Sequence, residues 1–124
     1  MKKAHALQAE YRFGEWGPAY LIRGEAAEMG VLVLRPGDAM ENHYHEHCDE
    51  SFIVLSGECD LWIDAAERHT MRFGDVYQSQ PGEMHYLVNN SGAEFRCIFI
   101  KTPASPGDTI TVPWTPGEEK PERP

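Results

Sequence analysis

The chain has 124 residues, of which 41% are apolar, enough for one domain with one hydrophobic core. Its formal net charge is −9, and because such a surface repels phosphate backbones we expect no nucleic-acid partner. No apolar run approaches the roughly 18 residues of a membrane span, and none follows Lys2 and Lys3 as a signal peptide would require. The three cysteines cannot all pair, which fits a reducing compartment. We therefore expect a cytoplasmic domain without a membrane partner.

Short strand-like segments separated by turns rich in Gly, Pro and Asn make up most of the chain. Only residues 4–11 show a weak helical pattern. The predicted strands are, in chain order, 19–23, 30–35, 41–45, 50–55, 58–64, 70–73, 76–80, 85–89 and 95–101. Many short strands at this spacing favour an all-β sandwich or barrel.

The composition divides the chain into an N-terminal arm (1–18), a barrel (19–103) and a proline-rich C-terminal arm and tail (104–124). Within the last region, residues 109–114 can still add an edge strand. Residues 31–34 are apolar on both faces, so they are expected to be covered by the rest of the fold or by a partner subunit. We expect a homodimer, because a symmetric dimer is the commonest way to bury such a face.

Histidine and glutamate residues cluster near the middle of the chain. On a strand, His43 and His45 share one face. A turn after His45 is expected to place Glu50 opposite it on the next strand, where paired Cβ atoms lie about 4.5–5.5 Å apart. Two imidazoles and a carboxylate would then converge, and these groups bind divalent transition metals. Phe52 has the same parity as Glu50 and is expected to form an apolar wall beside the site.

Here the sequence resembles the cupin superfamily, whose first motif reads G-x5-H-x-H-x(3,4)-E-x6-G. Every fixed position of that motif is matched at the required spacing, by Gly37, His43, His45, Glu50 and Gly57. The match includes the three residues that the strand pattern brings together.

The second motif of the same superfamily, G-x5-P-x-G-x2-H-x3-N, follows at residues 74–89. Gly74, Gly82, His85 and Asn89 match it, and Gln80 stands in place of the first proline. Both glycines, like the first glycine of the first motif, map onto tight-turn positions where a positive φ is often needed. The two motifs together cover less than half of the chain.

The resemblance implies a jelly-roll barrel with one divalent transition metal near an open end. The metal would be manganese, iron, nickel, cobalt or zinc. His43, His45 and Glu50 map onto the ligands of the first motif, and His85 maps onto the ligand of the second. The partner implied by this arrangement is a small-molecule substrate.

Three residues near these positions are candidates for a catalytic role. Glu83 and Tyr86 flank His85, and Glu83 is a candidate general acid or base. His47 lies in the turn after His45, where it is either a rim residue or an alternative ligand.

Further residues are candidates for contact with a substrate, in addition to Phe52. Gln78 and Gln80 share parity, so they face either the cavity, where they would orient a hydroxylated or carboxylated ligand, or solvent. Cys59 is inward by parity and is either close to the metal or a small buried apolar residue. Arg96, like Lys101, lies on a strand where it can clamp an anionic substrate, although a lone cation is more often a surface charge.

Four protein ligands leave two positions of an octahedral metal open to water or substrate. The first hypothesis is a non-redox isomerase, epimerase or lyase for a small polar, sugar-like or carboxylated substrate. The second is an iron-dependent dioxygenase, which would consume oxygen. The third is a non-catalytic metabolite- or sugar-binding module. Because a fold and its ligands do not determine the reaction, the sequence leaves all three open.

Overall fold

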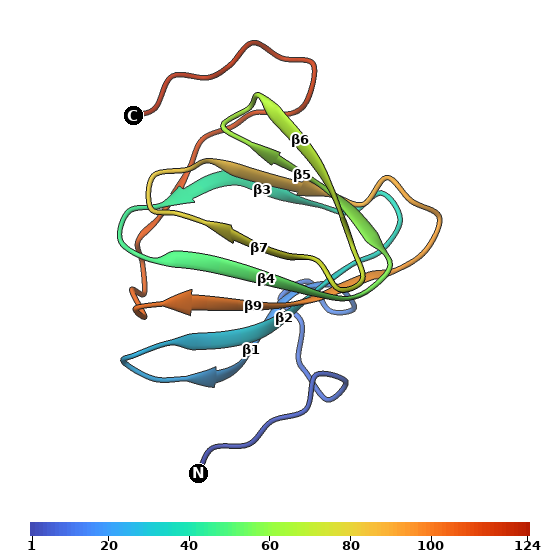
Figure 1. Ribbon diagram of the computed structural model, residues 1–124, viewed down its shortest axis with the longest axis vertical. Coiled ribbons are helices and arrows are strands. Elements are labelled where there is room, and N and C mark those ends of the chain that lie inside the picture. Colours follow the sequence, from blue (N-terminus) through green and yellow to red (C-terminus); the bar gives the residue numbers. More distant parts are fainter.

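The computed structural model describes residues 1–124 and contains ten strands in two five-stranded sheets (Figure 1). The strand pairs within both sheets are antiparallel. The all-β prediction is therefore confirmed. The weak helical pattern of residues 4–11 is not realised, because this segment is irregular apart from one turn. The structure has no helix with the length and apolar character that crossing a membrane demands.

The first sheet has the strand order β1-β2-β9-β4-β7 and lies in the lower half of Figure 1. Its strands are β1 (Gly17–Arg23), β2 (Glu28–Leu34), β9 (Phe95–Thr102), β4 (Asp49–Ser56) and β7 (Val76–Ser79). Almost every residue of β2 is buried, whereas β4 and β9 bury alternate residues on their inner face.

The second sheet has the strand order β10-β3-β8-β5-β6 and packs face to face against the first. Its strands are β10 (Thr109–Thr111), β3 (Ala39–His45), β8 (His85–Val88), β5 (Glu58–Ile63) and β6 (Glu67–Arg72). The C-terminal arm thus contributes an edge strand, and β10 pairs with the part of β3 that carries His43 and His45.

The main core lies between the two sheets and consists of alternate residues from their strands. In β5, Cys59 and Leu61 are buried while Glu58 is exposed, as the alternating pattern predicts. Leu34 and Phe95 from the first sheet complete this cluster and are fully buried. The core fills one end of the barrel and leaves the other end free for a site.

A second, smaller cluster covers the outer face of β2. Val31 and Val33 pack there with Ala19 of β1, and the N-terminal segment with Ala9 and Tyr11 lies over them. The chain's own arm therefore covers the face for which a partner subunit was expected. The homodimer stays a prediction, and this apolar face does not require it.

The predicted pairing of β3 with β4 is wrong. The turn after His45 crosses from one sheet to the other, so β3 pairs with β8 and β10 while β4 pairs with β9 and β7. Glu50 therefore faces His45 across the barrel interior rather than beside it in one sheet. The tight-turn prediction holds for the motif glycines, because Gly37, Gly74 and Gly82 have φ values of 88°, 88° and 85°.

Candidate metal centre

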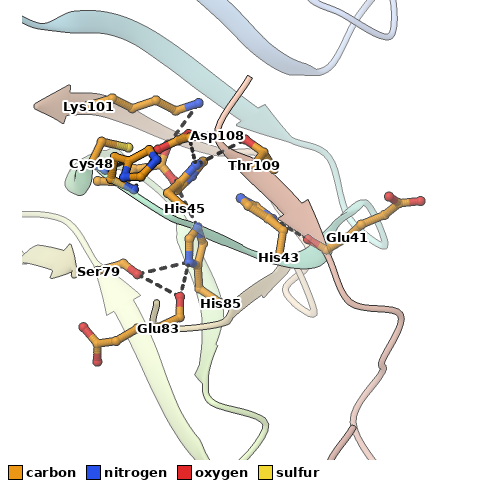
Figure 2. A network of polar contacts seen from close by, with 12 residues as sticks. Glu41, His43, His45, Cys48, Ser79, Glu83, His85, Lys101, Asp108 and Thr109 are labelled. Atoms are coloured by element: carbon orange, nitrogen blue, oxygen red, sulfur yellow. Dashed lines mark hydrogen bonds and ion pairs between the residues drawn. The ribbon is translucent and has the colours of Figure 1, made fainter. Parts of the chain in front are cut away.

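Four side chains with metal-ligating atoms converge between the two sheets. Each of His43, His45, Glu50 and His85 offers one such atom, and these atoms lie within 4.8 Å of one another. The Nε2 atoms of His45 and His85 are 3.2 Å and 3.0 Å from Glu50 Oε1. Figure 2 shows the three imidazoles turned toward one another. The residues predicted as ligands from the sequence thus lie together.

Strand register explains why these residues meet. His43 pairs directly with His85 across β3 and β8, and His45 lies two residues further along the same face of β3. Glu50 is near the start of β4 in the opposite sheet. It points into the barrel because it has the same parity as the core residue Phe52.

The His45 ring is fixed from behind by the segment that leads into β10. Its Nδ1 atom lies 3.1 Å from Asp108 Oδ1 and 3.2 Å from Thr109 Oγ1. Asp108 is itself held, since its Oδ2 accepts hydrogen bonds from the backbone N–H groups of His47 and Cys48 at 3.1 Å and 3.3 Å. A carboxylate at Nδ1 keeps the proton there and turns the Nε2 lone pair toward the cluster.

The other two rings are held in the same way. His43 Nδ1 donates to the carbonyl of Glu41 at 2.6 Å. His85 Nδ1 lies 3.2 Å from the carbonyl of Glu83 and 3.1 Å from Ser79 Oγ. A carbonyl only accepts hydrogen bonds, so Nδ1 carries the proton in both rings. All three imidazoles therefore present Nε2 to the common point.

These residues fit one divalent transition metal. Two ligand atoms bound about 2.1 Å from a metal and at right angles lie about 3.0 Å apart. The contacts of His45 and His85 with Glu50 Oε1 are 3.2 Å and 3.0 Å long. Imidazole nitrogens combined with a carboxylate suit manganese, iron, cobalt, nickel or zinc.

The electrostatics place the ligands in the protonation states that metal binding needs. Burial opposes the charge of Glu50, but hydrogen bonds from His45 and His85, with the charges of His85 and Lys101, hold its pKa well below the usual range. Burial, reinforced by His85, lowers the pKa of His43 to about 3. At neutral pH, Glu50 is therefore a carboxylate and His43 is a neutral imidazole.

A second group of ligand types, His45, Cys48 and Asp108, lies directly behind the first. Burial, together with the charge of Asp108, raises the pKa of Cys48 to about 12, so this thiol keeps its proton and is a poor ligand. Burial also opposes the charge of Asp108, but hydrogen bonds from the backbone of His47 and from His45 outweigh it and lower the pKa of Asp108. This group supports His45 and does not form a second metal site.

The ligand cluster opens into a cavity of about 360 Å³ with aromatic walls. Phe13 and Trp16 come from the segment before β1, and their ring centroids are 4.5 Å apart. Tyr20 of β1 meets Phe99 of β9 edge to face at 5.2 Å, and Phe52 of β4 lies beside the ligands. Apolar walls with a few convergent polar groups are typical of small-molecule sites.

Lys101 of β9 brings a positive charge to this cavity. Its Nζ donates to the Tyr20 hydroxyl at 2.7 Å and lies 4.0 Å from Glu50 Oε2. Burial disfavours the ammonium ion, but the charge of Glu50 and the contact with Tyr20 outweigh it and raise the pKa of Lys101. Lys101 is therefore a fixed cation beside the ligand cluster.

The predicted substrate contacts separate into residues inside and outside the cavity. Phe52 lines it, as expected. Cys59 does not, since it is a buried core residue whose thiol lies 3.4 Å from the carbonyl of Val88. Arg96 points to the outer face of the first sheet, where it donates to the carbonyl of Ala6 at 3.1 Å and to the hydroxyl of Tyr11 at 2.8 Å. Arg96 thus anchors the N-terminal arm.

Gln78 and Gln80 lie on the outside of the barrel, so of the two alternatives the one in which they face the cavity is wrong. Their shared parity was predicted correctly, but Ser79 between them is the residue that pairs with Glu50 and points inward. Gln78 donates to Ser51 Oγ at 3.0 Å on the exposed face of β4. Gln80 is exposed in the following turn.

None of the three candidate catalytic side chains lines the cavity. The Glu83 carboxylate accepts a hydrogen bond from a backbone N–H of its own turn at 2.7 Å, and only its carbonyl faces His85. Tyr86 alternates with His85 and packs outside against Trp114, with ring centroids 5.9 Å apart. His47 is exposed at the rim. In this structure these residues support or border the site.

Sequence reasoning missed Asp108 and Tyr20. Asp108 follows the Pro106-Gly107 turn in the arm, and no motif marks it. The one available signal was the predicted edge strand of residues 109–114, which begins one residue later. Tyr20 lies in a predicted strand whose facing residues depend on pairing with β2.

The model of the cupin domain family matches residues 30–101 of the chain. This range runs from β2 to β9 and includes His43, His45, Glu50 and His85. It leaves out Tyr20 and the aromatic segment before β1.

Two curated relatives from Streptomyces match the chain over part of their length. Protein SchB of Streptomyces halstedii is 31% identical over 78 residues, which cover 63% of this chain and 56% of the relative. Polyketide synthase CurC of Streptomyces cyaneus is 29% identical over 83 residues, which cover 66% of this chain and 53% of the relative. The chain spans about half the length of these relatives.

Among solved structures, the polyketide cyclase RemF of Streptomyces resistomycificus is similar with a TM-score of 0.76. The similarity covers 98% of this chain and 89% of that one at 19% sequence identity. At this identity the likeness shows a shared fold, which includes the N-terminal segment and the C-terminal arm.

Proposed function

The chain belongs to the cupin domain family, and on this basis we propose that it is a metal-dependent enzyme for a small oxygenated molecule with an aromatic, polyketide-like framework. One observation carries this proposal: three imidazoles and the Glu50 carboxylate face a cavity whose walls are aromatic. The names of two similar proteins, a polyketide synthase and a polyketide cyclase, support the same substrate class.

The cavity walls favour a flat ring over a sugar. Phe13, Trp16, Phe52 and Phe99 offer faces and edges to a planar ligand, whereas a sugar needs many hydrogen-bond partners. The charged residues and histidines that line the cavity are those of the ligand cluster together with Lys101, Arg12 and Glu41. A hydroxylated or carboxylated aromatic substrate satisfies both features.

His43, His45, Glu50 and His85 would hold the metal, which when bound polarises a carbonyl or stabilises an enediolate. The chain's own groups then act on the substrate. Lys101 offers a positive charge to a substrate oxygen, and the aromatic walls keep water away, which strengthens that attraction. These roles need no change of oxidation state, so we propose a non-redox isomerase or lyase.

The proposal is tested by metal content and turnover measured on the same preparation. We expect about one divalent metal per chain by elemental analysis, and conversion of aromatic polyketide-type hydroxyketones without oxygen uptake. Glu50→Gln keeps the shape of the side chain but removes its charge, so it should lose most of the metal and all of the turnover. Glu46→Gln, at an exposed position in the adjacent turn, is the matched control.

Other outcomes overturn the proposal in identifiable ways. Iron with substrate-dependent oxygen uptake would assign the dioxygenase hypothesis instead. Ligand-induced stabilisation without turnover across the panel would assign a binding module. Equal metal content in Glu50→Gln and the native chain would remove the metal centre itself.

A further inference from the structure

We propose that Lys101 and Tyr20 form the binding site for an acidic oxygen of the substrate, so that the cavity selects flat aromatic anions over neutral aromatic compounds of the same size. Carboxylate, phenolate and enolate oxygens share the chemistry that this pair recognises. The inference deepens the proposed function and rests on it in that the cavity holds a small molecule and the ligand cluster binds a cation.

Lys101 has hydrogen-bonding capacity that the protein does not use. An ammonium group has three donors, and the single hydrogen bond of Lys101 goes to the Tyr20 hydroxyl at 2.7 Å. Glu50 Oε2 at 4.0 Å is beyond hydrogen-bond distance. The Lys101 side chain is only 15% exposed, so water does not readily serve the remaining donors.

Glu50 offsets the charge of Lys101 while its carboxylate is free, whereas Glu28, which pairs with Lys101 across β2 and β9, lies 3.5 Å from Arg23. In the cluster of His43, His45, Glu50 and His85, Glu50 is the single anionic ligand. When it neutralises a bound cation, it no longer offsets Lys101, and a ligand anion gains from both charges. Glu41 is exposed and its carboxylate turns away from the cluster (Figure 2).

Tyr20 is held in place as the second half of the pair. Its ring packs edge to face on Phe99, and the guanidinium of Arg23 lies 3.8 Å from its centroid on β1. Because Lys101 donates to the phenol oxygen, the phenol's own proton is free to be donated to a ligand. The pair therefore offers an ammonium and a hydroxyl donor within 2.7 Å of each other.

The walls around Lys101 determine which shape of anion can bind in the cavity. Phe13 and Trp16 line the same cavity as Lys101, and their rings provide apolar faces for a planar ligand. An acidic group on an aromatic ring can reach the ammonium while the ring stays among apolar side chains. A small inorganic anion would leave these walls unfilled.

Binding of two probes of similar shape tests the inference: 2-naphthoate, which is anionic, and 2-naphthalenemethanol, which is neutral. Their dissociation constants are measured by calorimetry on the zinc-loaded and the metal-free protein. We expect the native chain to prefer 2-naphthoate by about tenfold with zinc and by less without it, as for a hydrogen bond to a charged group. Metal content, measured in parallel, reports separately on the proposed function.

Variants of Lys101 and Tyr20 test whether these two residues cause the preference for 2-naphthoate. Lys101→Met keeps the length of the side chain and should abolish the preference, while 2-naphthalenemethanol binds unchanged. Tyr20→Phe removes only the hydroxyl and should raise the dissociation constant of 2-naphthoate about threefold. Lys120→Met, in the exposed C-terminal tail, is the control and should change neither probe. A preference that survives Lys101→Met and requires zinc would mean that the carboxylate binds the metal, which would overturn the inference, as would the absence of any preference.

Discussion

The two ends of the cavity are built in opposite ways. At the ligand end, every imidazole has an oxygen partner at Nδ1, and His45, Glu50 and His85 are almost fully buried. At the aromatic end, Phe13 is 48% exposed. The side chains of the ligand end are held in place by hydrogen bonds within the protein, whereas the aromatic end is partly exposed.

The two ends of the cavity determine different properties of the site. A ligand cluster fixed by neighbouring oxygens is preorganised for a metal, and its residues come from strands inside the range that the family model matches. Of the aromatic wall, Phe13, Trp16 and Tyr20 lie outside the range that the family model matches, whereas Phe52 and Phe99 lie inside it. Such a division lets one metal centre serve different substrates through changes in a short peripheral segment.

The largest effect on stability is expected from a substitution at Gly30, beneath the aromatic ring of Phe99. Gly30 pairs with Phe99 in the first sheet, and a Cβ atom at this position would collide with the Phe99 ring and with the backbone oxygen of Ala19. Because the backbone cannot move away, Gly30→Ala should lower the free energy of unfolding by about 3 kcal/mol, measured by urea denaturation. The substitution should also displace Phe99 from Tyr20 and weaken the binding of 2-naphthoate.

Gly92→Ala is the matched control, because a Cβ atom there meets nothing within 4 Å and the backbone needs no positive φ. It should leave both stability and probe binding unchanged. If Gly30→Ala were as stable as Gly92→Ala, the Phe99 ring and the nearby backbone would be able to shift and make room for the added Cβ atom. The contrast between the two ends of the cavity would then concern exposure alone.

The sequence predicted the ligand end well because its information is local. Spacing placed His43 and His45 on one face of a strand, and motif positions added Glu50 and His85. The sequence wrongly predicted that Glu50 lies beside His45 in one sheet. A turn of this length can connect two strands of a hairpin or two strands in different sheets. Only the long-range pairing of β4 with β9 decides between them.

The outer support of the ligand end was beyond sequence reasoning, because it depends on long-range strand pairing. Whether Gln78 or Ser79 faces inward depends on the register of β7 against β4, and a shift of one residue reverses every side chain. Asp108 reaches His45 from 63 residues away, and only the pairing of β10 with β3 brings it there. Contacts of this kind leave no periodic pattern in the sequence.

Replacing Asp108 tests whether the ligand end is rigid because of its outer support. Asp108→Asn removes the charge behind His45 and sets an NH₂ group against backbone donors of His47 and Cys48. We expect metal affinity to fall by about 10- to 100-fold, measured by competition with a chelating dye. Asp49→Asn, on the opposite face of β4 from Glu50, is the control.

A cobalt-loaded sample separates positioning from general destabilisation. If Asp108 positions His45, the absorption bands of the bound cobalt should shift in Asp108→Asn but not in Asp49→Asn. Unchanged bands with unchanged affinity would show that His45 keeps its orientation without the carboxylate. The rigidity of the ligand end would then have to come from Thr109 and the strand itself.

The smallest effect concerns pH, and its sign follows from burial at the ligand end. In the unfolded chain His43 takes up a proton near its ordinary pKa of 6.5, whereas in the folded protein burial lowers the pKa to about 3. Between these values the unfolded state binds more protons, so the free energy of unfolding falls as the pH falls. From pH 7.5 to pH 6 the loss should be about 1 kcal/mol for the metal-free protein.

Glu50 and Asp108 also have lowered pKa values, but their stabilisation is lost only at pH values below their ordinary values of 4.5 and 3.8. These two carboxylates therefore contribute no slope between pH 7.5 and pH 6. His43→Gln should flatten the slope in thermal denaturation with a chelator present, whereas His47→Gln, at the exposed rim, should not. A native slope in His43→Gln would mean that the burial of His43 does not cause the slope, and the contrast in burial between the two ends would lose this support.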